Sequence, residues 1–141
     1  MGATSLHFSD AELACPHCHV NGCQRELVDA LEAFRVLVHR PVRINSAYRC
    51  AKYNAQAGGA GKSEHVAGMA ADIRVEGMTA AQLESVALRI LAIRGIGRDD
   101  RRQYIHIDVR SAPTLARWCY SASGQWCSYY PPIIRNDLEA A

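Results

Sequence analysis

Two segments of the chain repeat apolar residues at the spacing of an amphipathic helix. The first predicts a helix over Arg25–His39, where apolar residues recur every three or four positions until Pro41 ends the pattern. The second predicts a helix over Ala80–Arg94, with Thr79 as its N-terminal cap and Gly95–Gly97 as its end. Each helix would therefore have one apolar face that can pack on a core.

Shorter segments alternate apolar and polar residues, which is the period of a β-strand. They predict three strands, over Val42–Asn45, Ala70–Val75 and Tyr104–Val109. A short helix is predicted from Pro113 through Trp118. Elements in this order predict an α+β domain, in which two helices pack on a small antiparallel sheet.

Two local signals complete this outline. Ser9–Glu12 has the pattern of a capping box, so we predict a short helical turn that ends near Pro16. Ala57–Gly61 is too rich in glycine for a regular element, so we predict a loop there.

The composition limits the class of protein. The length of 141 residues fits one domain, residues 1–141, and 49% hydrophobic with 21% charged residues is typical of a globular protein. No apolar run approaches the roughly 20 residues of a membrane span, so we expect none. Met1–Asp10 lacks the basic and apolar regions of a secretory signal, so we expect synthesis in the cytoplasm without a signal peptide. The net charge of +2 favours no nucleic-acid partner.

The cysteines are numerous for so short a chain. Six are present, three of them in a Cys-rich loop over residues 15–23: Cys15, Cys18, Cys23, Cys50, Cys119 and Cys127. One interpretation is a second, structural zinc ion, whose ligands would be Cys15, Cys18 and Cys23, completed by Cys50, His17 or His19. Disulfides are the interpretation for a protein that leaves the cytoplasm, and free thiols are the third.

The residues with the clearest chemistry follow the glycine-rich loop. A catalytic zinc site needs about three His, Asp or Glu ligands and an open position. His65 ends the loop, Asp72 lies on the next predicted strand, and His106 and Asp108 share one face of a later strand. If the two strands are neighbours with coincident faces, then His65, Asp72 and His106 converge on one point.

This set of residues resembles a known family. Ser63, His65, Gly68, Ala70 and Asp72 match the pattern Ser-x-His-x-x-Gly-x-Ala-x-Asp of the zinc D-alanyl-D-alanine carboxypeptidase-like peptidases. That family includes vancomycin-resistance dipeptidases, phage endolysins and the related hedgehog signalling domain. The preceding segments are also similar, and the resemblance covers about residues 25–110: Ile44–Arg49, Asn54 and Gly58–Ala60.

The resemblance implies the hedgehog/DD-peptidase-like zinc fold and roles for particular residues. His65, Asp72 and His106 would bind Zn²⁺, and Ser63 would brace the loop and contribute to substrate binding. Arg49 would bind a substrate carboxylate or polarise the scissile carbonyl, because a guanidinium is a planar, permanently charged fork. The alternative for Arg49 is a structural ion pair with a carboxylate such as Asp72.

One position departs from the family. Several relatives carry the general base three residues before the last His, where this chain has Gln103, which cannot accept a proton at neutral pH. Asp108 is the first candidate to replace it, and Asp100 and Asp99 come next. The alternative for Asp108 is a carboxylate that orients a metal ligand or pairs with Arg110.

The function that follows is a zinc metallopeptidase that hydrolyses D-amino-acid-containing stem peptides of bacterial peptidoglycan, as a carboxypeptidase or an endopeptidase. It would act on the cell wall in phage lysis or as a virion-associated enzyme. The alternative, favoured by Gln103, is a non-catalytic zinc-fold module of a phage or prophage with a binding or structural role. The aromatic tail, residues 117–132, would line a substrate groove or cover the core.

Overall fold

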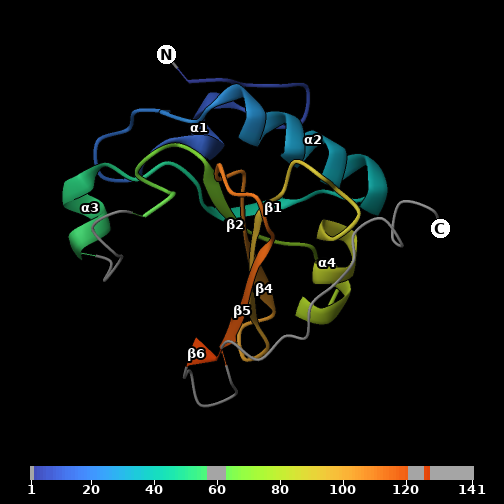
Figure 1. Ribbon diagram of the computed structural model, residues 1–141. Helices are drawn as coiled ribbons and strands as arrows, with labels where there is room; N and C mark the ends of the chain where they lie inside the picture. The colour runs from blue at the N-terminus through green and yellow to red at the C-terminus, as the bar shows by residue number, and fades with distance from the viewer. Residues whose placement is uncertain (1, 57–62, 121–125, 128–141) are drawn as a thin grey trace.

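The computed structural model describes residues 2–56, 63–120 and 126–127. The predicted loop Ala57–Gly61 and much of the aromatic tail lie outside these residues. Among the described residues there are four helices and six strands (Figure 1), in this order: α1 Asp10–Leu13, α2 Arg25–Val38, β1 Arg43–Ser46, α3 Ala51–Gln56, β2 Ala70–Arg74, α4 Ala80–Ala87, β3 Gly95–Asp99, β4 Tyr104–Asp108, β5 Ala116–Tyr120 and β6 Trp126–Cys127.

The strands form one sheet in the order β1-β2-β4-β3-β5-β6. Four neighbouring pairs are antiparallel, but β3 and β5 are parallel, so the prediction of an antiparallel sheet was wrong for this pair. The reason is the path of the chain. Both β3 and β5 run opposite to β4, and the chain leaving β4 passes to the far side of β3, so β5 lies beside β3 in the same direction.

The core lies between the helices and one face of the sheet. Leu27, Leu31 and Phe34 of α2 are fully buried, and they belong to one cluster with Ile73 of β2 and Ile105 of β4. Figure 1 shows α2 and α4 beside this sheet. Each fully buried Leu, Ile or Phe side chain stabilises the fold by roughly 1.5–3 kcal/mol. Because side chains alternate along a strand, Asp72 and His106 point to the opposite face.

Both predicted helix starts are confirmed. Ser9 and Glu12 form a capping box at α1, and Thr79 and Gln82 form one at α4. The helix predicted over Arg25–His39 is also confirmed. It is α2, which begins at Arg25 and ends at Val38, one residue before the predicted end. These are the segments in which local hydrogen bonding and apolar spacing agree.

The second predicted helix is too long. α4 ends at Ala87, and Gly95–Asp99 is strand β3 rather than the end of a helix. The buried residues Ile90 and Ile93 continue the helical spacing, but they belong to the turn between α4 and β3. Glycine has a low propensity for both helix and strand, so the sequence of this segment does not indicate a strand. Its pairing with β4 holds it as one.

Two short elements were also mispredicted. The prediction of a helix from Pro113 through Trp118 is wrong. Ala116–Tyr120 is strand β5, and each of its residues pairs with a residue of β3. Its aromatic residues favour a strand. The helix α3 was not predicted, since six residues are too few to show a helical period. In the part of the chain that the structure describes, no helix is long and apolar enough to cross a membrane.

Candidate metal centre

The segment that carries His65 is held by hydrogen bonds and by close backbone packing. The His65 N–H donates to Ser63 Oγ at 3.2 Å, as expected for a residue that braces the loop, and the Arg49 N–H donates to the His65 carbonyl at 3.2 Å. Gly68 follows with φ +74°, and a Cβ there would lie 1.9 Å from the Gly22 carbonyl oxygen. Only glycine fits both conditions, which explains its place in the motif.

The three predicted metal ligands lie together. Asp72 on β2 and His106 on β4 are register partners, so their side chains share one face of the sheet. His65 Nε2 lies 3.3 Å from Asp72 Oδ1, and His106 Nδ1 lies 3.2 Å from the same oxygen. The three ligand atoms are all within 4.8 Å of one another. Two imidazoles and one carboxylate are a donor set that suits Zn²⁺ and leaves a fourth position open.

Hydrogen bonds orient both rings toward this point. His65 Nδ1 lies 2.8 Å from the Ala47 carbonyl oxygen, and His106 Nε2 lies 2.7 Å from Asp108 Oδ2. A carbonyl and a carboxylate can only accept, so these nitrogens carry the protons. His65 Nε2 and His106 Nδ1, on the side of Asp72, are therefore the nitrogens left to bind a metal. Fixing the tautomer in this way is how supporting groups prepare histidine ligands.

Asp108 is fully buried, and its carboxylate is shared by two partners. Arg110 donates to it through Nε at 2.8 Å and Nη2 at 2.7 Å, beside the bond from His106. Gly95 makes room for it, because a Cβ at that residue would lie 2.1 Å from Asp108 Oδ2. The arrangement holds the carboxylate behind His106, on the side away from Asp72.

The electrostatics of the metal-free site follow from this network. Burial opposes ionisation of Asp72, but its bonds to His106 and His65 outweigh burial and hold its pKa well below the usual range. The same balance lowers the pKa of Asp108, where Arg110 and His106 are the partners. Burial alone would lower the pKa of His106, but Asp108 and Asp72 on either side raise it to about 9. Without metal, the His106 ring is therefore protonated on both nitrogens and positively charged at neutral pH.

Arg49 is fixed by three side chains. Its Nε donates to Ser46 Oγ at 2.8 Å, Nη1 to Asn54 Oδ1 at 3.4 Å and Nη2 to Asp72 Oδ2 at 3.2 Å. The alternative ion pair with Asp72 is thus present. It engages the oxygen that does not face the histidines, and it leaves two further N–H donors on the guanidinium.

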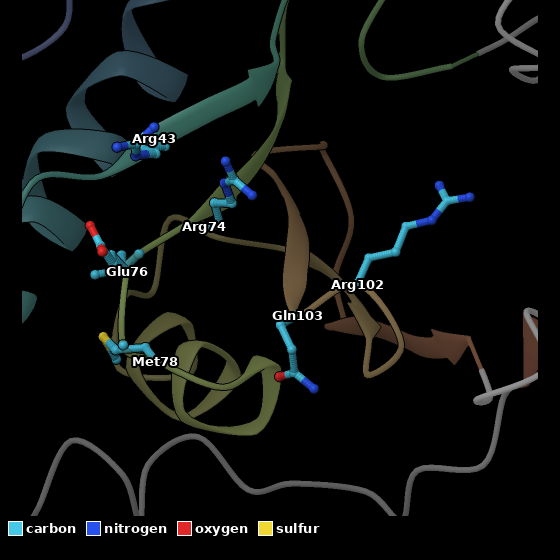
Figure 2. Close-up of a pocket in the computed structure, with 8 residues that line it drawn as sticks. Arg43, Arg74, Glu76, Met78, Arg102 and Gln103 are labelled. Carbon is cyan, nitrogen blue, oxygen red and sulfur yellow. The ribbon is translucent and has the colours of Figure 1, made fainter.

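A cleft of about 490 Å³ opens beside Asp72. Its lining includes three arginines and two tyrosines: Arg49, Arg74, Arg102, Tyr53 and Tyr104. Burial, followed by the charge of Asp72, raises the pKa of Tyr104 to about 12, so its hydroxyl keeps its proton at neutral pH. Arg74 and Arg102 also line a neighbouring hollow of about 390 Å³, which Figure 2 shows.

Gln103, which stands at the position of the family's base, and the two other candidate bases are engaged elsewhere. Gln103 accepts from the Ala80 N–H at 2.6 Å, and Figure 2 shows its side chain directed toward α4. Asp100 pairs with Arg98 at 2.7 Å and 3.0 Å, and Asp99 accepts the Arg102 N–H at 2.8 Å. The contacts described for these residues include none with His65, Asp72 or His106.

One residue near the centre was missed as a site residue. The Trp118 ring lies with its centroid 5.1 Å from that of His106, and the Arg110 guanidinium carbon lies 5.5 Å from the Trp118 ring centroid. The indole fits because Gly97 has no side chain, since a Cβ there would lie 2.4 Å from Trp118 Nε1. The available signal was Gly95-x-Gly97, because glycines inside a strand mark close approach by a neighbour.

The cysteines form a different group from the one predicted. Cys15, Cys18 and Cys50 place their sulfurs within 4.8 Å of one another, whereas Cys23 is buried apart from them with its Sγ 3.7 Å from the Leu13 carbonyl oxygen. The predicted trio with Cys23 is therefore corrected. Cys119 is disulfide-bonded, so the thiol interpretations do not apply to it.

An α+β domain that presents two imidazoles and a carboxylate at the edge of a cleft has the architecture of a metal-dependent hydrolase. Residues 6–108 match the family model described as Peptidase M15. The chain therefore belongs to the M15 peptidases, the zinc D-Ala-D-Ala carboxypeptidase-like metallopeptidases, and the resemblance inferred from the motif is confirmed. Among curated proteins, no sequence matches the chain.

Proposed function

We propose that this protein is a zinc peptidase that hydrolyses D-amino-acid-containing stem peptides of bacterial peptidoglycan. The observation that carries the proposal is the cluster of His65, Asp72 and His106, whose Asp72 lines a cleft together with three arginines. Stem peptides carry free carboxylates close to their scissile bonds. A cationic cleft beside a metal centre suits such a substrate.

The chain's own residues supply binding and orientation. A zinc ion held by the cluster would supply the Lewis-acid chemistry that acidifies water and polarises a carbonyl. Arg49 has N–H groups beyond those used by Ser46, Asn54 and Asp72, and it lines the cleft, so it can bind a substrate carboxylate or a developing oxyanion. Tyr104 offers a further donor there.

Asp108 is the residue for which we propose a supporting role rather than that of general base. Asp108 is fully buried, and its bonds to His106 and Arg110 engage both carboxylate oxygens. A base must be within hydrogen-bond reach of the proton that it takes, and Asp108 is oriented behind the ligand instead. The cluster on one loop and two paired strands also supports the hedgehog/DD-peptidase-like arrangement.

The test is digestion of purified peptidoglycan and of soluble stem peptides, with the products read by mass spectrometry. We expect fragments that identify one cleaved amide bond, and none from a peptide of the same composition built only from L-residues. A released terminal D-residue would define a carboxypeptidase, and cleavage within a cross-link would define an endopeptidase. His106→Ala is the inactive control. A zinc-loaded protein that releases no fragment from any of these substrates would overturn the proposal.

A non-catalytic zinc-fold module is the second candidate, and one observation favours it. No carboxylate occupies position 103, and Gln103 is bound to the N-terminus of α4. Such a module would bind peptidoglycan in a pull-down without releasing fragments.

The cell wall as the place of action, in phage lysis or as part of a virion, follows from the proposed substrate. Wall lysis after addition of the protein from outside would test it.

A further inference from the structure

The second cluster of metal-binding side chains lies outside the centre described above. Cys15 and Cys18 come from the turn after α1, and Cys50 directly precedes α3. Their sulfurs lie within 4.8 Å of one another. Around a tetrahedral zinc ion with Zn–S bonds of about 2.3 Å, sulfurs are about 3.8 Å apart. The three thiols are therefore close to the spacing of a zinc site.

A fourth donor lies next to this trio. His17 Nδ1 is 3.5 Å from Cys50 Sγ. An imidazole nitrogen and a thiolate on the same tetrahedral zinc ion are separated by about 3.5 Å, given bonds of about 2.0 and 2.3 Å. His17 is exposed, so its ring is free to turn toward Cys15 and Cys18. His19, the other histidine of this loop, has a left-handed backbone with φ 61°.

Backbone amides support the sulfurs as metal ligands. The Cys50 N–H donates to Cys15 Sγ at 3.4 Å, and the Tyr53 N–H donates to Cys50 Sγ at 3.4 Å. Such donors stabilise thiolates, which are the form that binds metal. Cys15 is fully buried while Cys18 is at the surface, so the cluster is closed on one side and has a path for an ion on the other.

The arrangement fits a metal better than a disulfide. A disulfide joins two sulfurs, and any pairing among these three would leave one thiol unpaired beside the His17 imidazole. The three cysteines are free thiols in the structure although they are neighbours. Three thiols and one histidine make a complete structural zinc set, which needs no open position.

We infer that Cys15, Cys18, Cys50 and His17 form a structural zinc site distinct from the centre at His65. The ion would join the turn after α1 to the residue that follows Arg49. Arg49 bonds Asp72, so this site would hold in place one support of the first centre. The inference does not depend on the proposed substrate, because it concerns metal content and not hydrolysis.

The experiment measures zinc per chain and the spectrum of the Co²⁺-substituted full-length protein. Thiolate–Co²⁺ bonds give intense charge-transfer absorption, whereas an imidazole–carboxylate site does not. We expect two equivalents of zinc in the wild type. His65→Ala should lose one and keep the thiolate–cobalt absorption. Cys18→Ser, at an exposed position, should lose the other equivalent together with that absorption.

Matched variants complete the design. Cys23→Ser lies in the same loop but outside the cluster, and it should keep both equivalents. His17→Ala should lower the zinc occupancy of the cysteine site, and His19→Ala should not; the reverse result would overturn the assignment of His17. A wild type without thiolate–cobalt absorption, full zinc content in Cys18→Ser, or a Cys15–Cys18 disulfide found by non-reducing peptide mapping would each overturn the site itself.

Discussion

The two clusters of metal-binding side chains are built on different supports. The centre at His65 has two of its residues on paired strands, Asp72 on β2 and His106 on β4, and it borders a cleft. The cysteine cluster is carried by a turn and by the residue before α3. One is held by a sheet whose register is fixed by the core, and the other by a turn and the start of a helix.

This difference teaches what each site needs from the protein. A centre that binds a substrate must exist before the metal arrives, with its rings oriented by groups such as Ala47 and Asp108. A structural site can take its shape from the ion, because ion binding and local folding are coupled. The first site should therefore lose function without losing structure, and the second should lose structure first.

The largest effect is expected from removing a ligand of the first centre. His106→Ala leaves a two-residue site, so hydrolysis should fall to background while the cysteine site keeps its zinc. The thermal midpoint should change by only a few degrees, since the core cluster on the other face is intact. Activity assays and calorimetry on the same sample measure both.

Cys18→Ser should give the opposite result. Its thermal midpoint should be lower by roughly 10 °C, while the folded protein should still hydrolyse substrate.

The next effect concerns the support of His106. Asp108→Asn removes the charge that binds His106 Nε2 and Arg110, so zinc affinity of the first centre should fall roughly 10- to 100-fold. Competition with a chelator measures it. Asp100→Asn is the control, since Asp100 pairs with Arg98. Unchanged zinc affinity with a roughly 10²- to 10⁴-fold loss of turnover in Asp108→Asn would instead make Asp108 the base. The same loss in Asp100→Asn would place the base in the β3–β4 turn.

Arg49 should matter for turnover more than for metal. Lysine cannot bond Ser46, Asn54 and Asp72 together, so Arg49→Lys should keep its zinc and lose about tenfold in kcat/KM, the equivalent of one charged hydrogen bond of roughly 1.5 kcal/mol. Arg74→Lys in the same cleft is the comparison. Equal losses in the two variants would mean that the cleft needs only positive charge.

The smallest effect is a dependence of metal binding on pH. Asp72 and Asp108 raise the pKa of His106 to about 9, so below that pH zinc must displace a proton from this ring. Apparent affinity should rise roughly tenfold per pH unit up to about pH 9 and then level off. Zinc titrations of Cys18→Ser, which isolates the first centre, measure the slope. A flat profile from about pH 7 to about pH 9 would contradict the proton held between the two carboxylates.

Sequence was sufficient where local pattern and tertiary structure agree. The helix over Arg25–His39 and the strands carrying Asp72 and His106 were predicted within a residue or two. The motif also predicted that His65 and Asp72 belong to one site, because the spacing between them spans one turn and the start of a strand, and the two residues do lie together. The convergence of Asp72 with His106 required strand neighbours that only the sheet could supply.

Sequence was insufficient where distant segments decide the outcome. The glycines of β3 have no strand propensity of their own, and only Asp108 and Trp118 opposite them explain why glycine is there. Cys23 is nearer in sequence to Cys18 than Cys50 is, yet Cys50 completes the cluster. Spacing alone left both roles of Asp108 open, whereas its bonds to Arg110 and His106, which favour a supporting carboxylate over a base, required the structure.

The match to the family ends at Asp108, and β5 begins at Ala116 beyond it. The three residues of the candidate metal centre thus come from the matched part of the chain, while Trp118, which packs on His106, comes from β5, between β3 and β6 in the sheet. This division makes the enzyme modular for evolution and for engineering. Exchanging the side chains of β5 would alter the packing beside His106, with the residues of the candidate metal centre left untouched.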